Sequence, residues 1–401
     1  MKFNQWTLGL AALGVVSLAS VAKADEAKMN ALQTALSSTT ISGYVDTSVE
    51  WGLSRDNTFS LGNLQDSIPF RSGKNDGFNL NVVKLTIEKP LDESEWAAGY
   101  KVDLLFGPDA NLLATGSPSS GDVGFENSDF GIKNAYVALR TPVGNGIDWK
   151  IGVFDTVIGY ETFEAGNNPN FTRSWGYAIE PTEHTGILGT YRINDSISVA
   201  AGVANTLSQN INDRAINDSE TWHKTFLASI ALTAPQDWGF IGGSTLYAGT
   251  VIGINNAGGS FVGFGNNDQG NYYAGLTLNT PVTGLKAGLA FDYVHDLGGS
   301  QFDAWVAGAY LSYQATEKLS VHARGEYGEV EGAGLTADSE ATLSSLTGTV
   351  QYDLWKNVIS RLEIRWDQAY DKNGLDLDSS GTFTRYANTG LSLYANFIYK
   401  F

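Results

Sequence analysis

From residue 41 to the last residue, the chain alternates between apolar and polar side chains, and this period of two constrains the fold more than any other feature. In the stretch 41–51, Val45 and Val49 fall on one face, while Asp46 and Glu50 fall on the other. Successive side chains of a β-strand point to opposite faces of the sheet, so such a stretch is a strand with one apolar and one polar face. The sequence therefore predicts an all-β fold.

The same alternation recurs often enough to predict about sixteen strands in an up-and-down order. The expected strands cover residues 41–51, 78–89, 96–106, 130–141, 147–155, 184–193, 196–205, 221–233, 241–254, 269–280, 284–295, 302–315, 318–330, 342–354, 357–370 and 386–401. The apolar face is ambiguous in 130–141, and 241–254 is rich in glycine.

The connections between these strands alternate in length. The odd-numbered connections are long and cover residues 52–77, 107–129, 156–183, 206–220, 255–268, 296–301, 331–341 and 371–385. The even-numbered connections are short and cover residues 90–95, 142–146, 194–195, 234–240, 281–283, 316–317 and 355–356. Short turns on the periplasmic side and long loops on the outer side are typical of a transmembrane β-barrel of the outer membrane. The pattern predicts a transmembrane antiparallel β-barrel in the cell outer membrane.

The last strand carries the clearest single motif. Phe397, Tyr399 and Phe401 occupy alternate positions up to the C-terminus, with small or apolar residues continuing the same face upstream. A terminal aromatic residue preceded by apolar residues at every second position is similar to the signal that the barrel assembly machinery reads. We expect these three residues to form the assembly signal.

The N-terminus predicts export. Lys2 precedes an apolar stretch over 8–22, and the triplet Ala22-Lys23-Ala24 has the form of a cleavage site. Residues 1–24 are therefore expected to be a cleaved signal peptide. Residues 25–40 are expected to form a periplasmic segment containing a short helix, and residues 41–401 the barrel.

The charge balance excludes one class of partner. The chain has a net charge of −18, and removing residues 1–24, which hold two lysines and no acid, brings it to −20. Nucleic-acid binding requires a basic surface, so no nucleic-acid partner is expected. The excess of acid fits cations, polar solutes or a cation-bridged surface, and lipopolysaccharide and outer-membrane lipid are the expected surroundings.

The predicted closure implies a function. A strand that faces lipid cannot leave its backbone groups unpaired, so the sheet must close on itself. At about sixteen strands the interior is too wide for side chains to fill, and it leaves an aqueous channel. The sequence therefore predicts passive diffusion of small hydrophilic solutes and ions.

Three segments of the chain resemble a known family. They are LTIEKPLDESEWAAGYKVDLLFG (85–107), AYVALRTPVGNGIDWKIGVFDTVIGYE (135–161) and NPNFTRSWGYAIEPTEHTG (168–186). They are similar to the beta-barrel porin-2 (OmpL-like) family of Gram-negative outer membranes, and the likeness is strongest over 78–190. The resemblance implies an outer-membrane porin, but it brings no defined substrate and no catalytic residue.

The longest unpatterned segment is a candidate constriction of the pore. In sixteen-stranded porins the third outer loop folds inward, and here the third long connection is 156–183. Its expected charged residues are Glu161, Glu164, Arg173, Glu180 and Glu183. By strand parity, the basic residues expected on the facing wall are Lys101, Lys286, Arg324, Arg361 and Arg365. Opposed charges across a narrow water gap would order polar solutes and set ion preference. The alternative is an outward loop whose charges do little.

Other functions stay open at this point. The barrel could be a substrate-specific or receptor-like channel whose loop plugs the lumen, or a structural or adhesive barrel that transports nothing. We expect no enzyme activity, because the sequence holds no GxSxG motif, no P-loop and no zinc motif, and its four histidines have no metal-ligand spacing. We accordingly predict no catalytic residue, no metal and no cofactor. A homotrimer is the assembly that known sixteen-stranded porins suggest.

Overall fold

The computed structural model describes most of the predicted barrel. The described residues are 38–53, 68–74, 76–113, 115, 129–207, 209–213, 223–254, 268–297, 302–332, 339–371, 376–377, 383–384 and 387–401. The predicted signal peptide, and residues 25–37 of the predicted periplasmic segment, lie outside them.

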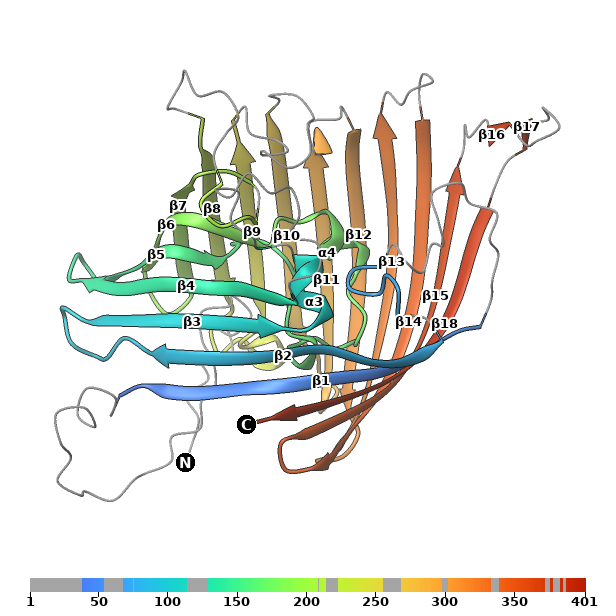
Figure 1. Ribbon diagram of the computed structural model, residues 1–401. Coiled ribbons are helices and arrows are strands. Elements are labelled where there is room, and N and C mark those ends of the chain that lie inside the picture. Colours follow the sequence, from blue (N-terminus) through green and yellow to red (C-terminus); the bar gives the residue numbers. More distant parts are fainter. Residues whose placement is uncertain are drawn as a thin grey trace.

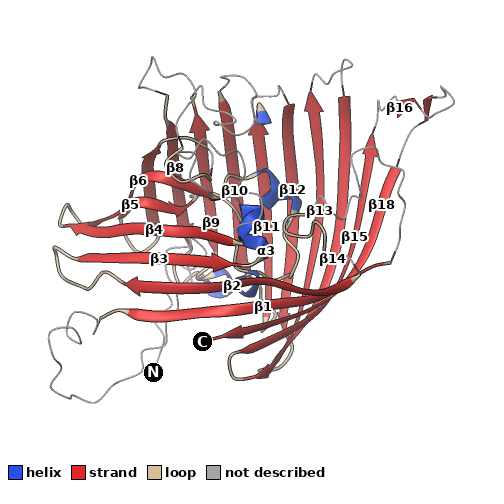
Figure 2. Cartoon of the chain, viewed as in Figure 1, coloured by secondary structure: helices blue, strands red, loops and turns tan. Residues whose placement is uncertain are grey.

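Sixteen antiparallel strands close into one barrel, in which each strand pairs with its neighbours in the sequence and the first pairs with the last. The strands are β1 (Thr40–Gly52), β2 (Gly77–Lys89), β3 (Ala98–Phe106), β4 (Phe130–Thr141), β5 (Ile147–Asp155), β6 (Glu183–Arg192), β7 (Ile197–Ala204), β8 (Thr225–Thr233), β9 (Thr245–Gly253), β10 (Gln269–Asn279), β11 (Leu285–His295), β12 (Phe302–Gln314), β13 (Leu319–Gly332), β14 (Ser339–Trp355), β15 (Val358–Asp371) and β18 (Ala387–Lys400). Figures 1 and 2 show the closed wall. The predicted all-β barrel, its order and its strand number are confirmed.

Two very short strands lie outside the barrel wall. They are β16 (Asp376–Leu377) and β17 (Phe383–Thr384), and they pair only with each other. They belong to the connection between β15 and β18 and do not change the strand order of the barrel.

The two faces of the wall differ as the alternation predicts. In β18, the inward residues Tyr394, Asn396 and Ile398 are buried, while the outward residues Phe397 and Tyr399 are about half exposed. The outward faces carry most of the exposed large apolar residues, and the inward faces carry most of the buried charged residues. This is the arrangement of a barrel whose outer surface meets lipid and whose interior meets water.

Exposed aromatic side chains mark both ends of the wall. Trp96, Trp238 and Trp355 lie at the short turns and are exposed, and Phe106 and Tyr327 lie near the long connections and are also exposed. Two such bands are typical of the two interfaces of an outer membrane. The band near the long connections includes stacked rings on neighbouring strands.

One connection on the side of the short turns is longer than the sequence predicts. β9 begins at Thr245 rather than near residue 241, because the 3₁₀ helix η4 (Gly239–Ile241) occupies the preceding turn. Gly239 and Gly243 have φ angles of +68° and +79°, which glycine adopts without strain. These glycines therefore serve the turn rather than the strand.

Two short helices lie inside the barrel. Helix α3 (Pro108–Leu113) packs against β2, β3 and β4, and helix α4 (Trp175–Ile179) packs against β11 and β12. Figure 1 shows both between the front and back walls. Among the described residues, no helix is long and apolar enough to cross a membrane. The packing of both helices on the strands shows that their connections turn into the lumen.

Candidate functional site: the lumen and its inward connections

The connection between β5 and β6 fills much of the lumen. It covers residues 156–182 and contains the 3₁₀ helix η3 (Ala165–Asn167) and helix α4. Its two ends are joined where Thr156 N donates to Thr182 O at 2.8 Å. Helix α4 begins after Ser174, whose Oγ accepts a hydrogen bond from Tyr177 N at 3.0 Å. Such a cap satisfies a backbone donor at the start of a helix.

A buried ion pair fastens this connection to β13. Arg324 Nη1 lies 2.8 Å from Glu161 Oε1, and both side chains are fully buried. The same nitrogen donates to Thr172 O at 2.6 Å, while Arg324 Nε lies 2.9 Å from Glu326 Oε2 on the same strand. Removing either partner of a buried pair leaves an uncompensated charge, so this contact holds the connection in place.

A single carboxylate on β15 holds the backbone of the connection. Glu363 accepts hydrogen bonds from Phe171 N at 2.5 Å, Thr172 N at 2.9 Å and Thr172 Oγ1 at 2.6 Å. It also accepts from Thr349 Oγ1 of β14 at 2.6 Å. Hydrogen bonds to an ionised acceptor are stronger than neutral ones, so Glu363 is a second anchor.

Two arginines on β15 hold the connection through its carbonyl groups. Arg361 donates to Ala165 O at 2.7 Å and to Asn168 O at 2.8 Å. Arg365 donates to Arg173 O at 2.6 Å, and its guanidinium lies 5.3 Å from the centre of the Trp175 ring. Both arginines are buried. They therefore act on the connection by direct contact.

The tip of the connection also contacts β2 and β4. Glu164 forms salt bridges with Lys84 of β2 and, at 3.8 Å, with Lys133 of β4. Burial would raise the pKa of Glu164, but Lys133 and Lys84 outweigh it and hold the pKa well below its ordinary value. The carboxylate is thus ionised and paired. The connection leaves the wall at β5 and is anchored on β13, which lies opposite β5 in the closed strand order, so it spans the lumen.

Helix α4 ends beside a second carboxylate of the wall. Glu180 follows the helix and lies against Asp292 of β11. Its removal from water, together with the charge and hydrogen bond of Asp292, raises the pKa of Glu180 well above its ordinary value. Two carboxyl groups in contact cannot both ionise without strong repulsion, so this contact depends on a proton.

Apolar packing supports these polar anchors. Phe163, Phe171 and Tyr177 of the connection pack in one cluster with Tyr394 and Ile398 of β18. A second cluster holds Val157 and Ile158 against the inward faces of β6 to β12, and a third holds Trp175 against Val306 of β12. Buried aromatic and aliphatic side chains contribute about 1.5–3 kcal/mol each. The connection is therefore a packed part of the interior.

Two other connections also turn inward. In the segment 68–74, Arg71 forms a salt bridge with Glu50 of β1, and Lys74 forms one with Asp109 of α3. Phe70 packs edge-on against Phe163, with ring centres 5.3 Å apart. Burial lowers the pKa of Lys74 to about 8. These contacts, which sequence reasoning missed, join the first three outer connections inside the lumen.

The predicted loop residues occupy four different environments. Glu161 and Glu164 are paired with wall cations, and Arg173 donates to the carbonyl groups of its own connection, including Phe171 O at 2.7 Å. Glu180 lies against Asp292. Glu183, predicted to end the loop, is instead the first residue of β6, and it lies 3.8 Å from Lys133.

The predicted wall residues divide into two groups. Arg324, Arg361 and Arg365 touch the connection directly, where the sequence predicts a water gap. Lys101 lies 3.4 Å from Asp103 on its own strand. Lys286 is exposed near the start of β11, at the short-turn end of the barrel. The structure thus brings the three arginines, but not these two lysines, against the predicted loop.

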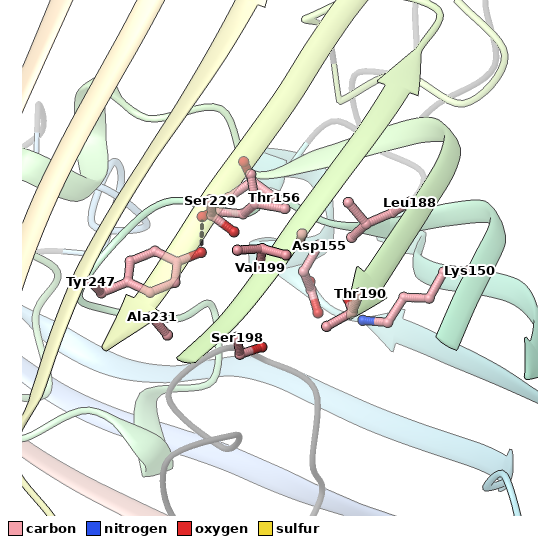
Figure 3. A pocket seen from close by; sticks show the side chains of 12 residues that line it. Lys150, Asp155, Thr156, Leu188, Thr190, Ser198, Val199, Ser229, Ala231 and Tyr247 are labelled. Atoms are coloured by element: carbon pink, nitrogen blue, oxygen red, sulfur yellow. Dashed lines mark hydrogen bonds between the residues drawn. The ribbon is translucent and has the colours of Figure 1, made fainter. Parts of the chain in front are cut away.

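An open pocket lies in the lumen beside the start of the connection. It is lined by β5 to β9 and by residues 155–157. Figure 3 shows Lys150 and the hydroxyl groups of the wall around it. Its lining residues are Lys150, Asp155, Thr156, Val157, Leu188, Thr190, Ser198, Val199, Ala200, Ser229, Ala231 and Tyr247.

Among the described residues, one set of carboxylates is close enough to share a cation. Glu329, Glu331 and Glu340 have ligand atoms within 4.8 Å of one another. Glu329 pairs in register with Trp305, whose ring stacks on Phe291 on the outer face. The cluster therefore lies on the outer face of the wall and not in the lumen.

One histidine in the lumen is bonded to serines. His322 Nδ1 lies 2.9 Å from Ser312 Oγ, and His322 Nε2 lies 3.1 Å from Ser320 Oγ. A catalytic triad requires one ring nitrogen to bond a carboxylate, which orients the imidazole for proton transfer. Here serine hydroxyl groups occupy both nitrogens, so the geometry differs from that of a triad.

Comparison with solved structures shows the same fold in outer-membrane channels. The outer membrane channel DcaP of Acinetobacter baumannii has a TM-score of 0.54 and 13% identity, covering 90% of this chain and 97% of its own. An anion-selective porin from Comamonas acidovorans has a TM-score of 0.53 and 14% identity, covering 91% and 99%. Salmonella typhi OmpF, in complex with daunomycin, has a TM-score of 0.54 and 11% identity, covering 90% and 97%.

Comparison by sequence identifies the family. No curated protein matches the chain. The family model described as "Putative beta-barrel porin-2, OmpL-like" matches residues 38–401, which include the whole barrel. This match confirms the resemblance seen in the sequence. It also agrees with the closed barrel and with the fold of the solved channels. The chain belongs to the beta-barrel porin-2, OmpL-like family, and it is an outer-membrane porin.

Proposed function

We propose that the protein carries small hydrophilic solutes and ions by passive diffusion, and that connection 156–182 is the constriction of its channel. The single observation that carries the proposal is the anchoring of this connection across the lumen. The connection leaves the wall at β5, and Arg324 holds it on β13, which is opposite β5 in the closed strand order. Glu363 holds it on β15, and Lys84 holds its tip on β2. A segment fixed at both sides narrows the water path without closing the space beside β5 to β9.

A planar bilayer tests this function. Purified protein should give ohmic current steps in KCl, and the reversal potential in asymmetric salt should report ion preference. A correctly folded barrel that stays silent at all voltages would show that the proposal is wrong. Replacement of Glu164 by Gln should lower the preference for cations, because that carboxylate lies at the tip of the connection.

A second candidate is a substrate-specific channel. The observation that favours it is the amount of packed material in the lumen, where three connections and three apolar clusters meet. A wide diffusion pore needs little of this packing. Saturable block of the KCl current by one solute class would favour this candidate, whereas currents that respond equally to unrelated solutes would favour general diffusion.

We infer a non-enzymatic role from the family and from the channels that share the fold. The predicted partners are outer-membrane lipid and lipopolysaccharide, the barrel assembly machinery and the diffusing solutes. A homotrimer is supported by one structure of the same fold, OmpT of Vibrio cholerae in a trimer form, with a TM-score of 0.52 and 15% identity over 90% of this chain and 99% of its own. Light scattering of the purified protein tests the assembly.

We also propose that residues 1–24 are removed on export and that Phe397, Tyr399 and Phe401 direct assembly. The outward, exposed positions of Phe397 and Tyr399 support the second part, since an assembly factor could reach them before the barrel enters the membrane. Mass spectrometry of the mature protein tests the cleavage. Deletion of Phe401 tests the signal and should lower the amount of folded barrel in the outer membrane.

A further inference from the structure

The lumenal pocket presents an ammonium group that the chain leaves unpaired. Lys150 lies on the inward face of β5 and lines the pocket. With the described part of the chain, its Nζ makes no salt bridge and no hydrogen bond, and its specific contact is with the ring of Tyr136, 5.1 Å from the ring centre. Most other cations of the lumen are bound to carboxylates or carbonyl groups. Lys150 is therefore available to a solute.

The one carboxylate in the pocket lining is already compensated. Asp155 forms a salt bridge with Lys133 through Oδ1, and its Oδ2 accepts a hydrogen bond from Asn134 Nδ2 at 3.2 Å. Lys133 therefore balances the negative charge of Asp155. Because Lys150 is not needed for that balance, it gives the pocket a net positive charge.

Hydroxyl groups line other parts of the pocket. Tyr247 donates to Val157 O and lies within hydrogen-bond distance of Ser229 in Figure 3. Thr156 is bonded to His184, and Ser229 and Tyr247 are bonded within the wall. Among the described residues, Thr190 and Ser198 make no side-chain hydrogen bond, so their hydroxyl groups can donate to and accept from the hydroxyl groups of a ligand. The hydroxyl-bearing residues of the pocket are Thr156, Thr190, Ser198, Ser229 and Tyr247.

The charge and the apolar part of the pocket narrow the class of ligand. The pocket is open to the rest of the lumen, so a solute can extend beyond its lining residues. Leu188 and the Tyr247 ring offer apolar surface for a carbon backbone. The pocket lining supplies one ammonium group without a partner in the described chain, so it suits a ligand with one negative charge.

We propose that this pocket is a subsite for a small polyhydroxylated monocarboxylate, that is, a sugar acid. The proposal deepens the proposed channel function and rests on it. Lys150 binds the carboxylate, the hydroxyl groups of the wall bind the hydroxyl groups of the solute, and Leu188 with Tyr247 contacts its carbon backbone. A solute held here lies beside the start of the constriction, on the side of the lumen that the connection leaves open.

Saturation-transfer NMR on the full-length protein in detergent micelles tests the subsite, with gluconate as the probe. The gluconate signal should saturate with increasing concentration. Glucose lacks the charge and acetate lacks the hydroxyl groups, so both should bind more weakly. Lys150→Gln should weaken gluconate binding by about tenfold, because it removes a hydrogen bond to a charged group. Lys150→Arg should restore most of the affinity.

Lys356→Gln is the matched control, since it removes the same charge from an exposed turn between β14 and β15. It should leave gluconate binding unchanged. Equal binding to the wild type and Lys150→Gln, or no binding at all, would overturn the subsite. KCl currents from the same preparation separate the two proposals. A barrel that conducts but does not bind gluconate loses only the subsite, and one that binds gluconate but carries no current loses only the channel function.

Discussion

Gly288 of β11 lies directly against Tyr160 of the inward connection, and a Cβ atom added to this glycine would overlap the Tyr160 hydroxyl group. Tyr160 in turn stacks on Tyr310 of β12, with ring centres 4.1 Å apart and ring planes 22° from parallel. The missing side chain on β11 is what allows the tyrosine to lie flat against the wall. Gly249 of β9 does the same for Ile158, whose Cγ2 would lie 2.8 Å from an added Cβ.

Gly288→Ala should therefore loosen the connection. Overpacking a closely packed site costs about 1–3 kcal/mol, and here the cheapest relief is displacement of Tyr160. We expect a lower unfolding temperature and a larger or noisier single-channel conductance. Gly325→Ala is the matched control, because the nearest atom to its added Cβ is Leu346 Cδ1 at 4.0 Å. Equal behaviour of the two variants would contradict this account.

Breaking the ion pair between Arg324 and Glu161 should release the connection from β13. Removing one partner of a buried pair costs about 3–5 kcal/mol, since the other charge stays buried and unpaired. Arg324→Gln should therefore raise conductance more than the double variant Arg324→Gln with Glu161→Gln. The two variants are compared with the wild type by single-channel recording and thermal unfolding. Arg140→Gln, which breaks a partly exposed pair with Asp148, is the control and should cost about 1 kcal/mol or less.

Docking of the connection should weaken as pH rises, because Glu180 docks against Asp292 in its protonated form. The pKa of Glu180 is raised in the docked state. At a pH above the ordinary pKa of a carboxyl group, the undocked side chain is therefore ionised while the docked one keeps its proton. The free energy that favours docking is largest in acid, and it decreases as pH rises towards the raised pKa. Single-channel conductance should increase between pH 4 and pH 9.

Glu180→Gln should remove this dependence, because an amide stays neutral at every pH in the series. Glu317→Gln, in the exposed turn between β12 and β13, should keep the wild-type profile. Conductance that falls with rising pH in the wild type would show that Glu180 does not control docking.

The two sides of the lumen should differ in their access to water. Ser198 lines the open pocket, whereas Ser345 of β14 faces the lumen but is only 4% exposed. The chain has no cysteine, so single replacements can be labelled without background. A charged thiol reagent should modify Ser198→Cys quickly and reduce the current. Ser345→Cys should react slowly. Equally fast labelling of the two variants would contradict a packed interior beside β14.

The alternation in the sequence is enough to predict the barrel, because lipid on one side and water on the other act on every strand. The expected stretch 318–330 becomes β13 (Leu319–Gly332) with the same two faces. The predicted strand bounds are least accurate where the backbone conformation of a turn, and not the alternation of side chains, determines where a strand begins. In the turn before β9, Gly239 and Gly243 have positive φ angles that a period of two cannot reveal.

The arrangement in the lumen could be predicted only in part. The position of a residue in the alternation assigns its side chain to one face of the wall, but it does not give the height of that side chain along the barrel axis or the residue that it contacts. Parity places Arg324, Arg361 and Arg365 inside, but the direct contact of these arginines with connection 156–182 depends on a packed interior. Lys133 was missed for a different reason. A register shift between β3 and β4 falls beside it, between the pairs Asp103 with Asn134 and Leu104 with Ile132. The bulge turns Lys133 inward against the local alternation.

The pairing of β1 with β18 has a consequence for the order of assembly. Gly43 and Phe401 exchange backbone hydrogen bonds of 3.0 and 2.9 Å, so the ends of the wall meet only when the whole chain is present. Until then, two sheet edges stay open to other chains. The inward connection also depends on late strands, because its anchors are on β13, β14 and β15. A nascent chain that stops short of β15 therefore has neither a closed wall nor a fixed interior, and the inward connection is secured among the last steps of folding.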